Sequence, residues 1–499
     1  MMLDEATIRG LRERPVPPGQ HWIDGKPTDS LDGSTLDVLS PIDGQLLTRI
    51  ASAQARDVDI AVRAARRAYE SGVWSELAPA ARKAVLLRLA ERIDAHRDEL
   101  AVTGVRDNGT ELAMALKAEP GSAAASFRYY GEAVDKIYGQ IAPTAPKAMG
   151  LISREPVGVV GAIVPWNFPL MIGAWKLAPA LAMGNSVVLK PAESASLALT
   201  RLAQLATEAG LPDGVLNVVT GTGDTAGEAL ALHDDVDVLA FTGSGAVGRR
   251  LLEYAARSNL KRVYLELGGK SPHVIFADAP DIDEAAKSAV HGIFRNSGQV
   301  CVAGSRLLVQ KEICAEFLDR VVAGAEKLVV GDPLDPASDV GAVHSLEQLE
   351  KNLAYVEGAI AEGAVLRTGG KRILARSGGY YMSPTVFSDV TPEMRIAREE
   401  VFGPVLAVTS FDDEPHAVDL ANSTPYGLAA GIWTSDLSRA HRMTRRIKAG
   451  LIHVNCYGGS DITVPLGGMK QSGSGHDKSL LALDKYSEIK TAWLHLGNV

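Results

Sequence analysis

One cysteine of this chain has the surroundings that a catalytic thiol requires. Cys301 lies in the stretch NSGQVCVAGSR, residues 296–306, among small and flexible neighbours. Gly298 and Gly304 would let the backbone pass close to a ligand, and Val302 adds little bulk beside the sulfur. Cys301 is therefore the candidate nucleophile. A buried structural thiol is the commoner fate of a free cysteine, and this stretch alone leaves both interpretations open.

A glycine-rich segment indicates a nucleotide site. GSGAVG, residues 243–248, reads as GxGxxG, follows an apolar run and opens the helical sequence AVGRRLLEYAAR. In a dinucleotide fold an acidic residue about 20 positions further on binds ribose, and Glu266 stands there. Because Gly268 and Gly269 follow closely, Glu266 could equally project into a cleft as a general base. The motif alone does not choose between these roles.

The elements expected to position these residues begin with helices. Recurring apolar residues predict helices over residues 57–70, 80–106 and 121–138. The next segment, residues 139–153, is punctuated by proline and glycine and predicts an exposed hairpin.

From Val157 onward, short apolar runs alternate with helical segments, as a parallel sheet with crossovers requires. Five strands are expected, beginning at Val157, Ser186, Val215, Val236 and Arg262. This is a doubly wound nucleotide-binding pattern. A second α/β region is expected to follow, with helices near residues 282–294 and 345–362 and a strand at VLAVTSF.

Composition excludes several classes of protein. The 499 residues, 46% hydrophobic and 22% charged, suffice for two or three domains. A formal charge of -9 without a basic run argues against a nucleic-acid surface. Three scattered cysteines, Cys301, Cys314 and Cys456, with no CxxC pair suit a reducing compartment and suggest no metal. Without a long apolar segment, we expect a cytoplasmic protein that has no membrane partner.

Four motifs in order resemble the aldehyde dehydrogenase superfamily over nearly the whole chain: PWNFP from Pro165, LELGGKSP from Leu265, GQVCVAGSR from Gly298 and EEVFGPV from Glu399. The resemblance implies an α/β fold of three parts. A Rossmann-like parallel-sheet cofactor domain would comprise residues 1–138 and 154–268, and an α/β catalytic domain residues 269–468. A small β oligomerisation element would comprise residues 139–153 and 484–499, which implies a homodimer or homotetramer.

The resemblance also implies a reaction. Cys301 would attack the aldehyde to give a thiohemiacetal, which loses hydride to form a thioester. Asn167 and the Cys301 amide would stabilise the oxyanion, by roughly 3 kcal/mol per donor. Glu266 would activate the hydrolytic water, and Lys176 would relay its proton. Without the resemblance, Asn167 could be a helix cap, Glu266 a surface acid and Lys176 a solvated helix residue.

The resemblance implies NAD as the cofactor, with NADP possible. Lys190 and Glu193 would hold the adenosine ribose, because a carboxylate binds both hydroxyls but repels a 2′-phosphate; from spacing alone they would be a solvated turn. Gly245 would be incidental to the site. The other expected contacts are Ser244 and Val247 near the pyrophosphate and adenine, Glu400 and Phe402 near the nicotinamide half, and Val164, Pro165, Trp166, Gly243 and Leu267.

Two further segments, the tail KQSGSGHDKSLLALDKYSEIKTAW and SDITVPLGG, resemble the branch that acts on γ-glutamyl-γ-aminobutyraldehyde, guanidinobutyraldehyde and related aminoaldehydes. Glu119, Cys456 and Asp461 are the candidate substrate contacts. Asp477 stands where many relatives have glutamate, a change that this branch shares. Ala118 stands where the branch commonly has an acid, so an acidic wall is only partly present.

Three other functions remain open at this stage. The chain could be a broad-specificity aldehyde dehydrogenase. It could also be a cysteine esterase or thioesterase without redox activity, for which Cys301, Asn167 and Glu266 would suffice. A non-catalytic scaffold is the third, and the complete catalytic set argues against it.

Overall fold

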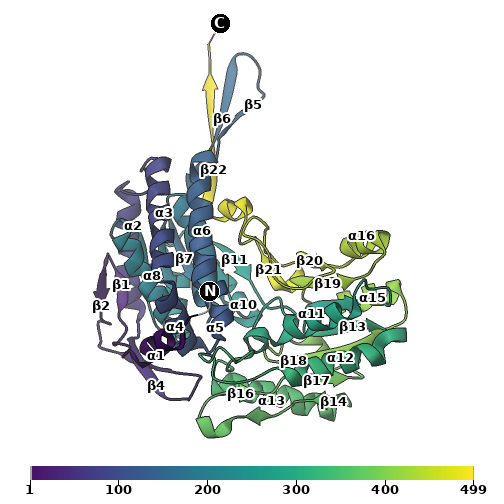
Figure 1. Ribbon diagram of the computed structural model, residues 1–499. Coiled ribbons are helices and arrows are strands. Elements are labelled where there is room, and N and C mark those ends of the chain that lie inside the picture. The colour runs from purple at the N-terminus through teal and green to yellow at the C-terminus, as the bar shows by residue number, and fades with distance from the viewer. Residues whose placement is uncertain (1–2, 498–499) are drawn as a thin grey trace.

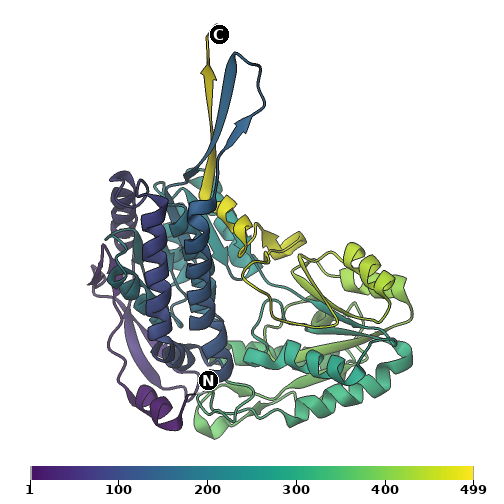
Figure 2. The same cartoon turned by 45° about the horizontal axis from the view of Figure 1, so that its top comes forward.

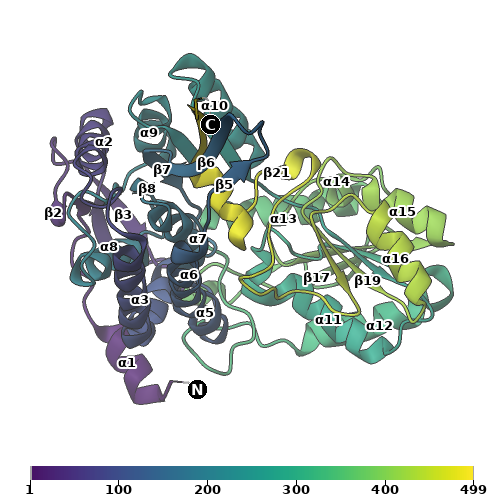
Figure 3. The ribbon, with the colours of Figure 1, turned by 90° about the horizontal axis from the view of Figure 1, so that it is seen from above.

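The structure, a computed structural model, describes residues 3–497 as two α/β lobes from which a β arm projects (Figures 1 and 2). The view from above shows the two lobes side by side (Figure 3). The α/β class expected from the sequence is confirmed. Residues 1–2 of the expected cofactor domain and residues 498–499 of the expected oligomerisation element lie outside the described residues.

The first lobe is built on an eight-stranded sheet in the order β2-β1-β9-β8-β7-β10-β11-β21. Its five expected strands are present and mutually parallel. Their bounds are β7 Val159–Ile163, β8 Ser186–Lys190, β9 Leu216–Val218, β10 Val238–Thr242 and β11 Arg262–Glu266. The inner strands are almost wholly buried because helices cover both faces, which explains their continuous apolar sequences. These helices include α2 Ala55–Glu70, α7 Pro169–Ala182, α8 Leu197–Glu208, α9 Glu228–Leu232 and α10 Gly245–Arg257.

The strand order reverses between β7 and β10. From β7 the chain adds β8 and β9 on one side, and then β10 and β11 on the other. The segments that leave the carboxyl ends of β7 and β10 begin at Val164 and Gly243. Doubly wound sheets bind ligands at such a reversal.

The second lobe contains a seven-stranded sheet in the order β14-β17-β18-β13-β12-β19-β20, parallel except for β14. Its strands are β12 Pro272–Ile275, β13 Arg306–Gln310, β14 Val365–Thr368, β17 Thr385–Ser388, β18 Val405–Phe411, β19 Ala429–Trp433 and β20 Leu451–Val454. Its helices are α11 Ile282–Phe294, α12 Cys314–Lys327, α13 Leu346–Ala361, α14 Arg395–Arg398, α15 Glu414–Asn422 and α16 Leu437–Arg446. Cys301 and Phe402 shortly precede the amino ends of β13 and β18, so these ends carry the predicted catalytic loops.

One predicted helix is two helices. The expected helix over residues 80–106 is divided into α3 Pro79–Ala95 and α4 Arg97–Asn108 at His96, whose φ is -107° and ψ 18°. The His96 ring bonds the Arg92 carbonyl oxygen and ends α3. The division lets α3 pack on α6, Pro120–Ala133, while α4 packs on α5, Leu112–Ala118, and α8. Helix α6 ends before residue 138 in a 3₁₀ turn at Val134–Lys136.

Several short elements, most of them two to six residues long, were not predicted. They are α1 Glu5–Glu13, β1 His21–Ile23, β2 Lys26–Thr28, β3 Thr35–Leu39, β4 Leu46–Ala51, β15 Arg372–Ile373, β16 Tyr381–Met382 and β21 Gly473–Ser474. Strand β21 returns from the second lobe to pair with β11, so it ties the two lobes together.

The expected hairpin is present as β5, Gln140–Ala142, and β6, Ala148–Pro156. Strand β22, Ser487–His495, pairs antiparallel with β6 along its whole length and completes the arm (Figure 1). The arm exposes apolar side chains, among them Ile141, Ile489 and Trp493. Within residues 3–497, no helix combines the length and apolarity needed to span a membrane.

Candidate active site

The loop that carries Cys301 has an unusual backbone. Asn296, Ser297 and Gly298 have φ values of 48°, 51° and 72°, three consecutive residues in the left-handed region. Non-glycine residues hold this conformation only when their surroundings impose it, and such strain concentrates at functional sites. At Gly298 a Cβ would lie 2.1 Å from the Gly403 carbonyl oxygen, so glycine is required there.

Buried hydrogen bonds impose the conformation of this loop. The Asn296 amide donates to Glu111 Oε1 at 3.0 Å, and its side-chain oxygen accepts from Thr110 Oγ1 at 2.9 Å. Ser297 Oγ donates to the Gly341 carbonyl oxygen at 2.8 Å. The loop is thereby attached to two segments far from it in sequence.

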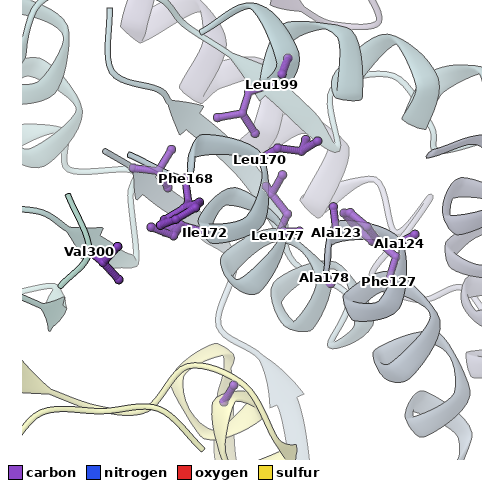
Figure 4. Packing of buried hydrophobic residues seen from close by; sticks show 14 of the residues in the cluster. Ala123, Ala124, Phe127, Phe168, Leu170, Ile172, Leu177, Ala178, Leu199 and Val300 are labelled. Atoms are coloured by element: carbon purple, nitrogen blue, oxygen red, sulfur yellow. The ribbon is translucent and has the colours of Figure 1, made fainter. Parts of the chain in front are cut away.

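Asn167 lies against the same loop. Its Nδ2 donates to the carbonyl oxygen of Gln299 at 2.9 Å, while Asn296 Nδ2 donates to the Asn167 carbonyl oxygen at 3.2 Å. Figure 4 shows Val300 near Phe168 and Ile172 at the start of α7, within one core cluster. An amide nitrogen has two hydrogens, so one remains for an oxyanion beside Cys301. The helix-cap interpretation of Asn167 is wrong, because α7 begins after Phe168 and has no side-chain cap.

Glu266 ends β11 and is buried, with no hydrogen-bond partner for Oε1 among the described residues. Burial, reinforced by the nearby Asp477 carboxylate, holds the pKa of Glu266 well above the ordinary carboxyl value. The surface-acid interpretation is therefore wrong. The following backbone touches the Cys301 loop, because a Cβ at Gly269 would lie 2.6 Å from the Cys301 carbonyl oxygen. Glu266 and Cys301 are thus brought together from two sheets.

Lys176 belongs to a buried charge cluster. Its Nζ lies 3.0 Å from Asp477 Oδ2, and Lys485 bonds the other carboxylate oxygen. Although burial acts to raise it, these two lysines hold the pKa of Asp477 below its ordinary value. Lys176 also lies close enough to Glu266 to favour its charged form. The solvated-helix interpretation of Lys176 is wrong, and Lys485 was not foreseen because no motif marks it.

The Cys301 side chain is half-buried, and all three cysteines are free. Burial raises the pKa of the Cys301 thiol to about 12, and the nearby Glu400 and Glu266 carboxylates act in the same direction. The thiol is therefore protonated at neutral pH and needs a base to become a nucleophile.

The expected cofactor residues lie at the carboxyl ends of the first sheet. Lys190 Nζ lies 3.1 Å from Glu193 Oε2 at the end of β8, and the Glu193 side chain is 43% exposed. Ser244 caps α10 by accepting from the Val247 amide at 3.3 Å. A Cβ at Gly245 would meet only the end of the Arg249 side chain, at 3.4 Å, so no close approach requires glycine there.

Two other glycines of the GxGxxG motif are packed tightly. A Cβ at Gly243 would lie 2.4 Å from the Phe241 ring, and one at Gly248 would lie 3.0 Å from the Leu267 side chain. Of the segment that follows β7, Val164 is buried and its amide donates to the Lys190 carbonyl oxygen at 3.1 Å, while Pro165 is half-buried. The motif thus joins a sheet end to a helix amino end.

Glu400, Phe402 and Trp166 complete this group of expected cofactor residues, which we call the cradle. Glu400 Oε1 accepts from the Gly269 amide at 3.0 Å, and burial raises the pKa of this carboxyl to about 7. The Trp166 ring stands edge-on to Phe402 at 5.4 Å and stacks on His344 at 4.2 Å. A helix amino end, an accessible ribose-type carboxylate and an aromatic wall together fit a dinucleotide.

The three candidate substrate contacts have different surroundings. Glu119 is buried, accepts from the Met171 amide at 2.7 Å in the first turn of α7, and has its pKa raised to about 8 by burial. It holds a helix in place, so the structure does not support an acidic wall there. Asp461 is exposed and accepts from the Thr463 amide at 2.9 Å. Cys456 is exposed just after β20.

Residues 28–492 match the aldehyde dehydrogenase family. The chain belongs to this family. It is 49% identical over 475 residues, 95% of each chain, to the NADP/NAD-dependent aldehyde dehydrogenase PuuC of Escherichia coli (strain K12).

Two solved structures show the same likeness to this aldehyde dehydrogenase. A γ-glutamyl-γ-aminobutyraldehyde dehydrogenase from Burkholderia cenocepacia J2315 superposes with a TM-score of 0.97 at 50% identity, over 99% of this chain and 100% of that one. An indole-3-acetaldehyde dehydrogenase complexed with NAD+ gives a TM-score of 0.98 at 49% identity, again over 99% and 100%.

The left-handed turn before Cys301 gives a test of the site's rigidity. We expect Gly298→Ala to destabilise the protein by about 2 kcal/mol or more, because the strained φ and the Gly403 carbonyl oxygen both oppose a Cβ. Thermal unfolding followed by fluorescence measures the loss. Gly358→Ala, inside α13 with no atom within 4 Å of its Cβ, is the control and should be neutral or stabilising. Equal melting temperatures for the two variants would contradict the constraint.

Proposed function

We propose that this aldehyde dehydrogenase uses NAD, and accepts NADP, to oxidise an aminoaldehyde such as γ-glutamyl-γ-aminobutyraldehyde or 4-guanidinobutyraldehyde to the carboxylic acid. The observation that carries the chemistry is the contact of the Glu266 strand end with the Cys301 loop, directly beside Asn167. The similarity to the γ-glutamyl-γ-aminobutyraldehyde dehydrogenase of Burkholderia cenocepacia supports the proposed substrate. The similarity to PuuC, an NADP/NAD-dependent enzyme, supports the proposed cofactors.

The residues of this chain divide the reaction between them. The Cys301 thiol releases its proton to solvent as Sγ attacks the aldehyde carbon, and Asn167 Nδ2 with the Cys301 amide stabilises the resulting oxyanion, each by roughly 3 kcal/mol. Bound NAD supplies the hydride acceptor. Glu266 then takes a proton from the water that hydrolyses the thioester, and the Lys176–Asp477 pair provides a route for that proton.

The cradle would hold the cofactor by its polar ends. We assign Lys190 and Glu193 to the adenosine ribose, the amino end of α10 at Ser244 to the pyrophosphate, and Glu400 to the nicotinamide ribose. The half-exposed Glu193 carboxylate would disfavour a 2′-phosphate without excluding it. Val164, Pro165, Trp166, Gly243, Val247, Leu267 and Phe402 would complete the cradle.

The proposal extends to the domain boundaries and to the cellular compartment. We assign residues 154–268 with residues 1–138 to cofactor binding and residues 269–468 to catalysis, a boundary that falls between β11 and β12. Three free cysteines are consistent with the reducing cytoplasm.

The hydrolase alternative uses fewer of the observed features. A cysteine esterase would need Cys301, Asn167 and Glu266 but not the cradle at the strand reversal. A broad-specificity aldehyde dehydrogenase differs from the proposal only in the substrate, so comparing pentanal with the two named aminoaldehydes separates them.

Replacement of the nucleophile tests the activity. We expect Cys301→Ala to lower NADH formation with 4-guanidinobutyraldehyde at least about thousandfold, because no covalent intermediate can form. Calorimetric titration should show NAD binding retained. Cys314→Ala, a half-buried thiol in α12, is the control and should keep parental turnover. Ester hydrolysis by the parent with no NADH formed from any aldehyde would favour the hydrolase instead.

Replacement of Glu266 separates acylation from deacylation. We expect Glu266→Gln to give a rapid burst of NADH followed by turnover about hundredfold slower, because the thioester lacks its base. In the parent, deacylation should rise with pH, since burial raises the pKa of Glu266 and only the deprotonated carboxylate accepts a proton. Stopped-flow absorbance across pH 5–9 measures both. Steady parental turnover in the variant would return Glu266 to a structural role.

We also propose that the arm joins two or four copies of the chain. Strand β22 is an edge of its sheet and presents Ile489, 58% exposed, and Trp493, 67% exposed. A long apolar edge strand requires a partner. We expect Ile489→Glu with Trp493→Glu to yield monomers in light scattering, whereas Leu437→Glu, at a residue on α16 that is 73% exposed, should not. A monomeric parent at micromolar concentration would refute the assembly.

A further inference from the structure

Arg295 lies close to the nucleophile and forms no ion pair within residues 3–497. It follows α11 and opens the left-handed turn that leads to Cys301. Its guanidinium makes no hydrogen bond or ion pair with any residue that the structure describes. Burial lowers the pKa of Arg295, and the charges of Tyr457, Cys301 and Glu111 all act to raise it, which places those groups around it.

The guanidinium lies against the backbone of Gly458. A Cβ at Gly458, where φ is 83°, would lie 2.6 Å from Arg295 Nη1 and 3.2 Å from Cζ, so only glycine leaves room for the group. The neighbouring Tyr457 hydroxyl donates to the Val302 carbonyl oxygen at 2.9 Å. The loop that carries Arg295 and the residue after Cys301 are thus both held against the same segment.

Arg295 is partly buried at the wall of a groove, and no carboxylate of residues 3–497 forms an ion pair with it. Arg295 lines a surface groove of about 640 Å³ together with Glu111 and His291. The nearest acid, Glu111, already accepts from the Asn296 amide, and burial raises its pKa. Burial, and next the Arg295 charge, lowers the pKa of both His291 and His453, which favours neutral rings beside the guanidinium.

A second cation lies beyond the same loop. Lys478 Nζ donates to Ser460 Oγ at 2.5 Å and lies 5.8 Å from the ring centre of Trp175, two turns along α7 from Asn167. Asp461 is exposed and turned toward Thr463. Arg295 and Lys478 thus border the segment 457–462, and the Asp461 carboxylate of this segment interacts with Lys478.

We propose that Arg295 binds a carboxylate of the substrate, so that this chain selects aldehydes that carry one. A planar guanidinium binds a carboxylate through two parallel hydrogen bonds. The inference rests on the proposed function and narrows it: γ-glutamyl-γ-aminobutyraldehyde, whose glutamyl end carries a carboxylate, is preferred to aldehydes with only a free amine or guanidine.

The test compares four aldehydes of different charge, three short ones of similar length and one longer glutamyl amide, on the parent, Arg295→Met and Arg295→Lys. The substrates are 5-oxopentanoate, γ-glutamyl-γ-aminobutyraldehyde, 4-aminobutyraldehyde and uncharged pentanal. We expect Arg295→Met to lose at least tenfold more kcat/KM on the two carboxylates than on pentanal, mainly through KM, and to gain relative efficiency on 4-aminobutyraldehyde. Arg295→Lys should recover part of the loss. Tenfold corresponds to about 1.4 kcal/mol.

A binding measurement and a control accompany the kinetics. Glutarate, a dicarboxylate that cannot react, should inhibit the parent competitively with the aldehyde and inhibit Arg295→Met at least tenfold more weakly. Arg320→Met removes an arginine of the same groove that is already paired with Asp283 and Glu316, and should leave all substrates unaffected.

The outcomes separate the two proposals. Equal loss on all four aldehydes would assign Arg295 to the thiol or to the loop structure and overturn the carboxylate site. A parent that prefers 4-aminobutyraldehyde to both carboxylates would also overturn it while leaving the aminoaldehyde function intact. A parent that oxidises pentanal as well as every charged aldehyde would remove the substrate proposal itself.

Discussion

The backbone turn of residues 296–298 is the constraint on which the site depends. Its left-handed residues are not stable by themselves, and buried bonds from Thr110, Glu111 and Gly341 hold them. This arrangement fixes where Cys301 leaves the loop, independently of the ligand. Conformational entropy is therefore lost on folding rather than on substrate binding, which is how a preorganised site lowers a reaction barrier. The strain at Asn296 and Ser297 is offset by contacts from both lobes, Thr110 and Glu111 in the first and Gly341 in the second.

Burial then determines the protonation states around that loop. Burial raises the pKa of three groups, the Cys301 thiol and the Glu266 and Glu400 carboxyls, and so favours the neutral form of each. Asp477 stays ionised because Lys176 and Lys485 bond its two oxygens. Removal of one partner would leave a buried charge uncompensated, at a cost of several kcal/mol. This cluster is thus a fixed charge beside groups whose protonation can change during the reaction.

The sequence could predict the fold where a local pattern determines structure. The five parallel strands are buried on both faces, so their apolar runs were sufficient. The divided helix at His96 could not be predicted, because its cause is packing against two different helices. Glu119 resembled a wall of the substrate site, yet it is buried and accepts from the Met171 amide in the first turn of α7. The sequence alone does not show whether the oxygens of an acidic residue are already bonded. Arg295 adjoins a recognised motif, but its lack of a partner is visible only in three dimensions.

The GxGxxG motif illustrates the same limit. Its spacing suggested a phosphate loop, whereas in the structure Gly243 and Gly248 are packed against Phe241 and Leu267, and Gly245 meets no close contact. The glycines that are needed at the catalytic centre lie elsewhere. Gly268 abuts the Glu400 carboxylate, Gly269 the Cys301 carbonyl oxygen and Gly298 the Gly403 carbonyl oxygen.

Each of these three contacts leaves no room for a Cβ, and two of them join backbone to backbone. The loop that carries Cys301 is therefore positioned by main-chain contacts with Gly269 and Gly403, which do not depend on the identity of the surrounding side chains. The side chains of Arg295 and Lys478, which border the segment 457–462, do not make these contacts. Because backbone contacts position the reacting groups and other side chains border the site, substitution of those side chains can change the substrate preference. The groups that carry out attack and hydrolysis then keep their positions.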